Sequence, residues 1–409
     1  MPYISSRAEK MPESPIRKLA PLADAARKRG TTVYQLNIGQ PDIATPKAFY
    51  DALKKADLEV LAYSHSAGNE SLRVKIANYY TRLNLPITKD EVLVTTGASE
   101  ALLFAFMTCL NPDDEVIVPE PFYANYNSFA LTAGIKVVPI TTHIEDDFDL
   151  PSVEEFEKLI TPNTKAIMIC NPGNPTGVLY ALPTLEKLRD IVKKHNLFLF
   201  ADEVYREFVY DGQKHYSVLG IEGLEQNAIV FDSISKRFSA CGARIGCVVT
   251  RNKEVMKAIL KYAQARLSPP TMGQIGAEAV YDLPQSFYDG VIAEYSERRT
   301  FMLDALEKME GVLCPKVTGA FYAVVKLPVV DAEDFCRWML ETFDYEGGTV
   351  MMAPANGFYA TKGLGVDEVR LAYVLKIADL AKAMKCLEEG LKAYPHRKES
   401  LTSASIKNT

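Results

Sequence analysis

Short apolar runs alternate with amphipathic segments through the middle of the chain. Apolar runs bounded by turn residues are typical of buried strands, whereas the apolar residues between them have helical spacing. Seven strands are predicted, at residues 91–95, 115–118, 136–140, 165–170, 197–200, 228–231 and 247–250. Because strands that alternate with helices form parallel sheets, we expect an α/β domain with a mostly parallel, seven-stranded sheet.

The two ends of the chain are predicted to form a second, smaller domain. A helix is predicted over residues 14–28, where Ser14 can cap it and Pro15 suits its first turn. Beyond residue 250, helices are predicted at 253–266, 287–309 and 377–394, and strands at 320–325, 349–353 and 367–373. We therefore expect a large domain over residues 46–289 and a smaller α+β domain made of residues 1–45 and 290–409.

Composition mainly excludes classes of protein. The 409 residues are 48% hydrophobic and 24% charged, and the net charge of −6 argues against binding to nucleic acid. No apolar run approaches membrane-spanning length, and residues 1–10 lack the apolar core of a signal peptide. The seven cysteines form no CxxC pair, so we expect no metal site, no disulfides and a cytoplasmic location. The polar segment 396–409 is expected to fray.

A lysine in a serine-rich turn is the first candidate for chemistry. The strand at residues 228–231 leads into Ser233, Ser235 and Lys236, and Arg244 follows between two glycines. Burial lowers the pKa of a lysine and makes its amine a nucleophile toward carbonyls. Serine hydroxyls and an arginine suit a phosphate, so the stretch suggests pyridoxal phosphate, an aldehyde cofactor with a phosphate group. The alternative is a surface loop with a solvated lysine and arginine.

Two further segments follow buried strands. Gly97, Ala98 and Ser99 lie between a strand and a helix, where backbone N–H groups can converge on an anion, although a generic loop has the same pattern. Asp202 ends the strand at residues 197–200, and functional carboxylates of open α/β sheets often lie at such ends. The alternative for Asp202 is the N-cap of a helix.

Several segments resemble, in order, the motifs of class I/II aminotransferases of fold type I, with the aspartate aminotransferase fold. The resemblance spans about residues 14–394 and is most specific in the heptad Asn-Pro-Gly-Asn-Pro-Thr-Gly. The matching segments are GQPD at 39–42, the stretch from Tyr63 to Arg73, GAS at 97–99, PFY at 121–123, the heptad at 171–177, DEVY at 202–205, SISK at 233–236 with Arg244, and VRLAY at 369–373. Alone, Gly39 could belong to a plain turn, and Tyr63 and Tyr123 could be packed aromatics.

The resemblance implies pyridoxal 5'-phosphate as cofactor and a role for each matching residue. Lys236 would bind the cofactor covalently and transfer protons, and Asp202 would keep its ring nitrogen charged. Tyr205 and Asn174 would contact its phenolic oxygen. The remaining implied contacts are Tyr123 against the ring; Gly97, Ala98, Ser99, Ser233, Arg244 and, less directly, Ser235 at the phosphate; Tyr63 from a neighbouring subunit; and Arg370, Gly39, Asn174 and Tyr123 at the substrate.

The implied activity is transfer of an amino group between an L-amino acid, with aspartate favoured, and a 2-oxo acid, by a homodimer with shared active sites. The second carboxylate of aspartate needs a cation, and Ser99 stands where some bacterial aspartate aminotransferases place a lysine. Arg266 is the candidate, although it could equally stabilise a helix C-terminus. Open alternatives are an aminotransferase for aromatic, alanine or other neutral amino acids, a C–S lyase or aminocyclopropane carboxylate synthase-like enzyme, and part of a transcriptional regulator.

Overall fold

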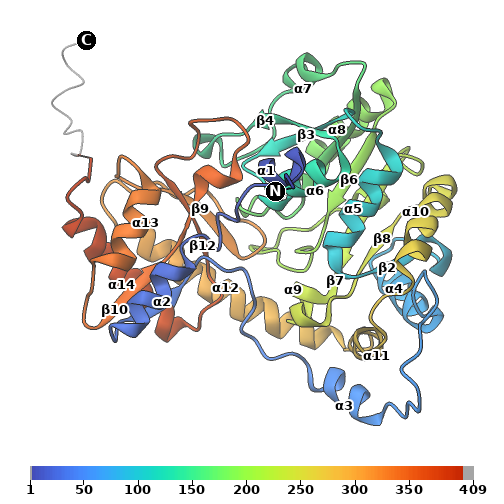
Figure 1. Ribbon diagram of the computed structural model, residues 1–409, viewed down its shortest axis with the longest axis horizontal. Coiled ribbons are helices and arrows are strands. Elements are labelled where there is room, and N and C mark those ends of the chain that lie inside the picture. The colour runs from blue at the N-terminus through green and yellow to red at the C-terminus, as the bar shows by residue number, and fades with distance from the viewer. Residues whose placement is uncertain (1, 399–409) are drawn as a thin grey trace.

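The computed structural model describes residues 2–398, which surround a seven-stranded sheet (Figure 1). Its strand order is β2-β8-β7-β6-β5-β3-β4. Only β8 runs antiparallel to its neighbours, so the sheet is mostly parallel, as the sequence predicts. The strands are β2 (Val92–Thr95), β3 (Glu115–Glu120), β4 (Lys136–Thr141), β5 (Thr164–Cys170), β6 (Phe198–Asp202), β7 (Ala228–Ser233) and β8 (Gly246–Val249).

Both faces of the large sheet are covered, which explains why the middle residues of its strands are mostly apolar. Alternate residues of β5 point to opposite faces: Ile167 and Ile169 pack in one core cluster, and Ala166 and Met168 in another. The helices of the large domain are α3 (Lys47–Lys55), α4 (Glu70–Arg82), α5 (Gly97–Cys109), α6 (Asn125–Ala133), α7 (Val153–Leu159), α8 (Leu182–His195), α9 (Ile234–Arg237), α10 (Lys253–Arg266) and α11 (Thr271–Val280). Among the helices of residues 2–398, none combines the length and the apolar composition of a membrane-spanning segment.

Helix α8 illustrates how local sequence sets these helices. Its apolar residues recur at helical spacing and face the core, a proline occupies its first turn, and Asn196 ends it in the left-handed conformation with φ of 53°. The buried side chains are Leu185, Leu188, Ile191 and Val192. Helices of this kind cover the sheet, so that its strands lie between two layers of helices.

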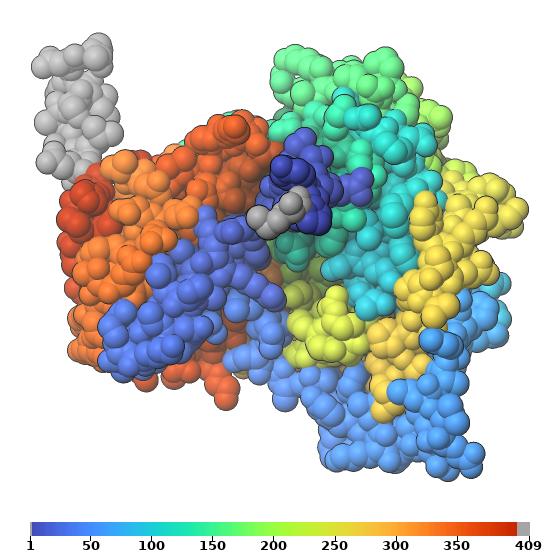
Figure 2. Space-filling view, in the orientation of Figure 1, coloured from blue at the N-terminus to red at the C-terminus, as the bar shows by residue number. Residues whose placement is uncertain are grey.

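A smaller domain combines the two ends of the chain. Strand β1 (Thr32–Gln35) pairs in parallel with β10 (Gly348–Met351), and a three-stranded antiparallel sheet has the order β11-β12-β9. Its other elements are β9 (Tyr322–Lys326), β11 (Ala353–Pro354), β12 (Glu368–Ala372), α2 (Ala20–Lys28), α12 (Gln285–Glu307), α13 (Ala332–Glu341) and α14 (Ile377–Ala393), and the short helix α1 (Ser6–Lys10) precedes them in the chain. The small and large domains lie side by side in Figure 2.

The structure departs from the sequence prediction at several places. The helix predicted from Ser14 begins only at Ala20, because Pro21 has no N–H to donate to the carbonyl of Arg17. Residues 97–99, predicted as a turn, form the first turn of α5. Helix α11 was not predicted. Most of the segment expected to fray, residues 399–409, lies outside the described residues.

Candidate active site

The strand ends of the large sheet bring the candidate residues to one edge. In the register of the sheet, Cys170 of β5 pairs with Asp202 of β6, and Asp202 pairs with Phe231 of β7. The Asn-Pro-Gly-Asn-Pro-Thr-Gly loop therefore follows β5 beside Asp202, and the turn with Lys236 follows β7 beside it. The parallel register explains why motifs far apart in sequence meet here.

The Lys236 side chain is half-buried between the two domains. Its Nζ donates a hydrogen bond of 2.6 Å to the carbonyl oxygen of Gly39 and lies 4.0 Å from Sγ of Cys241. Burial lowers the pKa of Lys236, and the positive charge of Arg370 acts in the same direction. A lysine in this environment is more readily neutral, which is the form that attacks a carbonyl.

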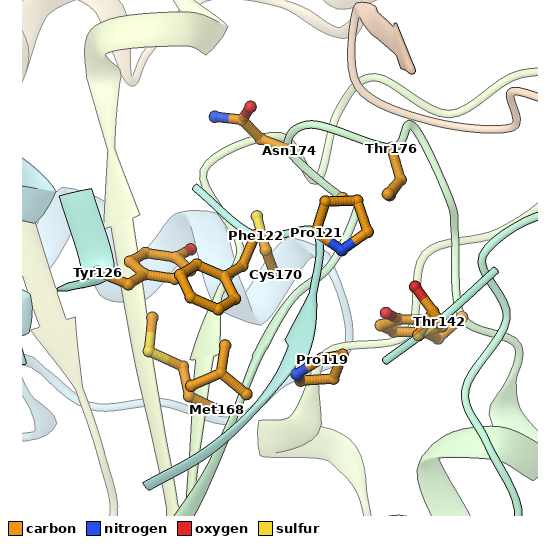
Figure 3. Close-up of a pocket in the computed structure, with 12 residues that line it drawn as sticks. Pro119, Pro121, Phe122, Tyr126, Thr142, Met168, Cys170, Asn174 and Thr176 are labelled. Atoms are coloured by element: carbon orange, nitrogen blue, oxygen red, sulfur yellow. The ribbon is translucent and has the colours of Figure 1, made fainter. Parts of the chain in front are cut away.

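Asp202 ends β6 and is also buried. Oδ2 of Asp202 accepts a hydrogen bond of 2.8 Å from the hydroxyl of Tyr126, and Oδ1 accepts a longer one of 3.4 Å from the Val204 N–H. Burial raises the pKa of Asp202 to about 6, although both hydrogen bonds act against the increase. At neutral pH the group is thus mainly a carboxylate. Tyr126, which the motifs did not single out, lies beside Phe122 and Cys170 in Figure 3.

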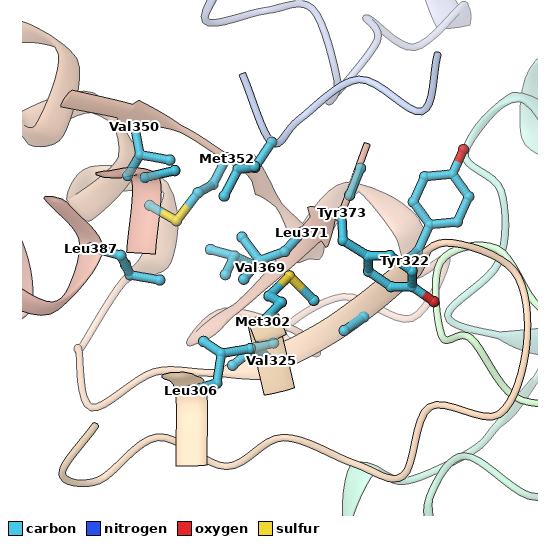
Figure 4. Close-up of a cluster of buried hydrophobic side chains, with 14 of the residues drawn as sticks. Met302, Leu306, Tyr322, Val325, Val350, Met352, Val369, Leu371, Tyr373 and Leu387 are labelled. Atoms are coloured by element: carbon cyan, nitrogen blue, oxygen red, sulfur yellow. The ribbon is translucent and has the colours of Figure 1, made fainter. Parts of the chain in front are cut away.

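Tyr205 belongs to a pair of buried tyrosines. Its hydroxyl lies 2.8 Å from the hydroxyl of Tyr322, which in turn lies 3.5 Å from the Gly39 carbonyl oxygen that Lys236 binds. A Cβ on Gly39 would lie 1.6 Å from the Tyr322 hydroxyl, so the backbone can approach this closely only at a glycine. Tyr322 lies at one end of the apolar core of the small domain (Figure 4). The pair therefore links the small domain to the lysine.

The first turn of α5 faces Arg244. A Cβ on Gly97, which has φ of +73°, would lie 2.3 Å from Nη2 of Arg244. The Arg244 side chain is exposed, and its contacts are the carbonyl oxygens of Cys241 and Thr96, at 3.2 and 3.5 Å. Helical N–H groups and a guanidinium without a carboxylate partner among residues 2–398 suit an anion. Ala98 and Ser99 belong to the same turn.

The two candidate serines contact each other rather than an open surface. The hydroxyl of Ser233 lies 2.8 Å from that of Ser235 and 2.9 Å from the carbonyl oxygen of Ile245. The Ser233 hydroxyl also accepts a hydrogen bond of 3.1 Å from the Ser235 N–H. Both side chains are buried next to Lys236. A phosphate contact would require the Ser233 hydroxyl to rotate away from these partners.

Arg370 of β12 is 1% exposed and is not paired with a carboxylate among the described residues. Nη1 donates to Oδ1 of Asn174 at 3.1 Å, and Nη2 donates to the carbonyl oxygen of Asn37. The guanidinium also lies over the rings of Tyr322 and Phe358, at 4.6 and 5.0 Å from their centroids. Because an unneutralised buried guanidinium is unfavourable, burial lowers the pKa of Arg370. This arrangement favours a carboxylate ligand.

Tyr123 lies close to these groups. Its ring is half-buried and packs edge-on against that of Tyr126, with centroids 5.5 Å apart, and its hydroxyl accepts a 2.8 Å hydrogen bond from Nδ2 of Asn125. Tyr126 and Tyr322 complete the site. The sequence did not predict a role for either residue, because buried tyrosines are usual in protein cores. Their signals would have been the spacing of Tyr126 three residues after Tyr123 and the position of Tyr322 on a small-domain strand.

Two candidates stand apart from this cluster. Tyr63 is 79% exposed, on a segment that projects from the large domain. Arg266 ends α10, where it forms an ion pair of 3.1 Å with Glu100 and donates 3.1 Å to the carbonyl oxygen of Ser66. Arg266 is therefore already neutralised. Its geometry favours the alternative, in which it stabilises the end of the helix.

The residues present fit pyridoxal phosphate. A half-buried amine with a lowered pKa suits its aldehyde, a buried carboxylate suits its ring nitrogen, and the turn of α5 with Arg244 suits its phosphate. The close approach of Gly97 to Arg244 leaves no room for a side chain there. Each chemical group of the cofactor thus has a matching partner at this edge of the sheet.

Comparisons with known proteins agree with this geometry. Residues 31–385 match the family described as aminotransferase class I and II. The chain is 31% identical over 396 residues to aromatic-amino-acid aminotransferase 2 of Thermococcus litoralis, covering 95% of this chain and 98% of the relative. It is 32% identical over 391 residues to the aspartate aminotransferase of Thermotoga maritima, covering 95% and 99%.

Solved structures of aminotransferases also resemble this chain. The aspartate aminotransferase of Thermus thermophilus with maleate superposes with a TM-score of 0.86 at 29% identity, over 96% of this chain and all of the other. The alanine aminotransferase of Pyrococcus furiosus superposes with a TM-score of 0.86 at 31% identity, over 95% and 100%. The chain therefore belongs to the class I and II aminotransferases of fold type I, and it is a pyridoxal phosphate-dependent aminotransferase.

Proposed function

We propose that this aminotransferase moves the amino group of L-aspartate to a 2-oxo acid. Several relatives bear the name aspartate aminotransferase, which supports aspartate as donor. The observation that carries the aminotransferase activity is Arg370, a buried guanidinium without a carboxylate partner in the described residues, which contacts Asn174, lies over Tyr322 and can bind the α-carboxylate that all amino-acid donors share. Tyr322 and Lys236 approach the same Gly39 carbonyl, so a carboxylate bound to Arg370 places its α-carbon near the lysine.

The side chains divide the work of the reaction. Arg370 binds the α-carboxylate with two parallel hydrogen bonds, with Gly39 and Asn174 beside it. Lys236, as a neutral amine, would remove the proton from the α-carbon of the substrate and deliver it to the carbon on the cofactor side of the transferred nitrogen. Pyridoxal phosphate, when bound, supplies the aldehyde that takes up the amino group and the ring that accepts the electron pair of the α-carbon.

The ring nitrogen and phenolic oxygen each need a fixed polar partner. Asp202, as a carboxylate oriented by Tyr126, would hold a proton on the ring nitrogen. Tyr205 and Asn174 hold the phenolic oxygen, and Tyr123 packs on the ring. The phosphate is bound by Gly97, Ala98, Ser99, Ser233 and Arg244, with Ser235 supporting Ser233.

We assign a cytoplasmic homodimer. The exposed segment before α4 carries apolar side chains that a monomer would leave in water: Leu58, Val60, Leu61 and Tyr63 are between 45% and 79% exposed. A symmetric dimer would bury this segment and bring Tyr63 to the phosphate of the other subunit. Within each subunit we assign residues 46–289 to the large domain and residues 1–45 with 290–409 to the small domain. The pairing of β1 with β10 supports this division.

A half-transamination screen tests the activity. The protein loaded with pyridoxal phosphate is mixed with single L-amino acids, and the cofactor absorbance and the 2-oxo acid formed are measured. Aspartate should convert the cofactor to its amine form with an equal amount of oxaloacetate and no ammonia. Ammonia release would indicate a lyase instead. If aromatic amino acids or alanine react faster than aspartate, one of them is the preferred donor instead of aspartate.

A further inference from the structure

The segment before α2 crosses the boundary between the two domains. Figure 2 shows the N-terminal segment, in dark blue, between the large and small domains. The Pro15 ring packs directly on Gly357, where a Cβ would lie 2.4 Å from the Pro15 Cβ. Ile16 packs against the small core cluster that contains Ala124 and Phe358. Phe358 is also the ring beneath the Arg370 guanidinium, so this segment borders the substrate site.

A chain of two hydrogen bonds fixes the segment relative to Arg370. Nη2 of Arg370 donates to the carbonyl oxygen of Asn37. The side chain of Asn37 in turn binds the N-terminal segment, because its Nδ2 donates a hydrogen bond of 2.8 Å to the carbonyl oxygen of Ile16. Asn37 is 1% exposed, so both bonds are shielded from water. The backbone after Ile16 therefore has a defined position next to the group assigned to the α-carboxylate.

The next residue, Arg17, is a cation at this border. Its side chain is exposed, and within residues 2–398 it makes no side-chain hydrogen bond or ion pair. Its neighbour Lys18 is paired with Glu333 at 2.5 Å. Burial raises the pKa of Tyr123, and the positive charges of Arg370, Arg17 and Arg244 oppose this increase. The charge of Arg17 thus reaches the tyrosine assigned to the cofactor ring.

We propose that Arg17 binds the side-chain carboxylate of a dicarboxylic substrate, and that it thereby selects aspartate, glutamate and their 2-oxo acids. This inference rests on the proposed function, because it names the residue that binds the second carboxylate of aspartate. Arg266 cannot take this role without breaking its pair with Glu100, and Lys18 would have to leave Glu333. Arg17 has no side-chain partner within residues 2–398 that it would have to give up. A dicarboxylate held between Arg370 and Arg17 would pair each of its carboxylates with one guanidinium.

The test compares Arg17→Ala and Arg17→Lys with Lys18→Ala, which removes the neighbouring charge of the same segment. The first readout is the half-transamination rate with aspartate and with alanine. Arg17→Ala should lower the rate with aspartate roughly tenfold to a hundredfold and leave the rate with alanine within about twofold. Arg17→Lys should recover part of the loss, and Lys18→Ala should behave as the wild type.

The second readout is equilibrium binding of succinate and propionate to the protein loaded with cofactor, measured by calorimetry. Wild type should bind succinate more tightly than propionate, and Arg17→Ala should bind the two about equally. Because Arg17 is exposed, the preference for succinate should weaken as ionic strength rises.

Two results would overturn the assignment. One is an equal loss with aspartate and alanine in Arg17→Ala, and the other is an unchanged preference for succinate in that variant. With either result, the wild type would still be an aminotransferase. A failure of the proposed function looks different, since no amino acid would then convert the cofactor in the wild type. Succinate binding would still decide the role of Arg17 in that case.

Discussion

The Tyr126 hydroxyl donates a hydrogen bond of 2.8 Å to Oδ2 of the Asp202 carboxylate, and both groups are buried. Burial raises the pKa of Asp202 to about 6, so the group is mainly a carboxylate at neutral pH but takes up a proton on mild acidification. The hydrogen bond favours the carboxylate, which is the form that can pair with a protonated ring nitrogen. Tyr126 therefore extends the pH range in which Asp202 can act on the cofactor.

Replacing Tyr126 with Phe should shift this range upward. The pKa of Asp202 should rise by about one unit, because one hydrogen bond to a charged group is lost. Affinity for pyridoxal phosphate falls as Asp202 becomes protonated, so the loss of affinity on acidification should begin at higher pH in the variant. Titrations of cofactor binding between pH 5 and pH 8 measure the shift. A profile that matches the wild type would show that Tyr126 is only a packing residue.

Lys236→Ala should abolish covalent attachment of the cofactor. After incubation with pyridoxal phosphate and reduction with borohydride, mass spectrometry of the wild type should find the modified peptide that contains Lys236. The variant should lack this modification, and its turnover should fall roughly 10³-fold or more because the proton-transfer base is also lost. The exposed Lys47 offers a matched control, since Lys47→Ala should retain both properties. Persistent labelling elsewhere with normal turnover would reject Lys236 as the anchor.

Much of the active site could be predicted from sequence because its residues lie in short local motifs at strand ends. Lys236, Asp202 and Asn174 each follow a strongly apolar strand, and the parallel register then brings them together. The small domain supplies what local patterns do not reveal. Tyr322 and Asn37 reach the site from β9 and from the end of β1, and only tertiary contacts give them a role.

Local sequence patterns also do not reveal which residue selects the substrate or which charged side chains pair in the core. Sequence patterns left Arg266 equally suited to a second carboxylate and to the end of a helix. Its pairing with Glu100 depends on the packing of α10 against α5, which no local pattern shows. The helix predicted from Ser14 also obscured the turns that carry Arg17. Likewise, no pattern showed that the residues next to Asp202, Tyr205, Ser233 and Lys236 would share one network. Glu203, Arg206, Asp232 and Arg237 are all buried, and ion pairs link them in that order.

Asp232 is the anion at the centre of that network, and its removal should destabilise the fold. Its two carboxylate oxygens accept hydrogen bonds from Nη2 of Arg237 at 2.9 and 3.0 Å, and Arg206 lies 3.9 Å away. Asp232→Ala should lower the free energy of unfolding by about 3–5 kcal/mol, because two guanidinium groups remain buried without it. Denaturant unfolding measures the loss. Lys385→Ala, at an exposed ion pair, should change little.

The pH dependence of this loss provides a second check. Burial alone would raise the pKa of Asp232, but Arg237 and Arg206 outweigh it and lower the pKa below 3.8. A carboxyl group with a lowered folded-state pKa stabilises the fold above its unfolded pKa and loses that contribution as pH falls through the folded value. The difference in stability between wild type and Asp232→Ala should therefore be constant near neutral pH and narrow only below pH about 4. A difference that narrows already at pH 6 would contradict this account.

Mixed dimers test whether Tyr63 completes the site of the other subunit. Tyr63 is 79% exposed in the single chain, and the apolar residues before it, Leu61 and Val60, are 64% and 74% exposed. Lys236→Ala subunits have no working lysine, and Tyr63→Ala dimers lack the tyrosine at both sites. A mixed dimer should contain one intact site, because the Tyr63→Ala subunit supplies Lys236 and the Lys236→Ala subunit supplies Tyr63. Mixing the two variants should therefore restore turnover and tight cofactor binding at one site per dimer. Differently tagged subunits allow the mixed dimer to be isolated. If confirmed mixed dimers are no more active than Tyr63→Ala dimers, Tyr63 does not act across the interface.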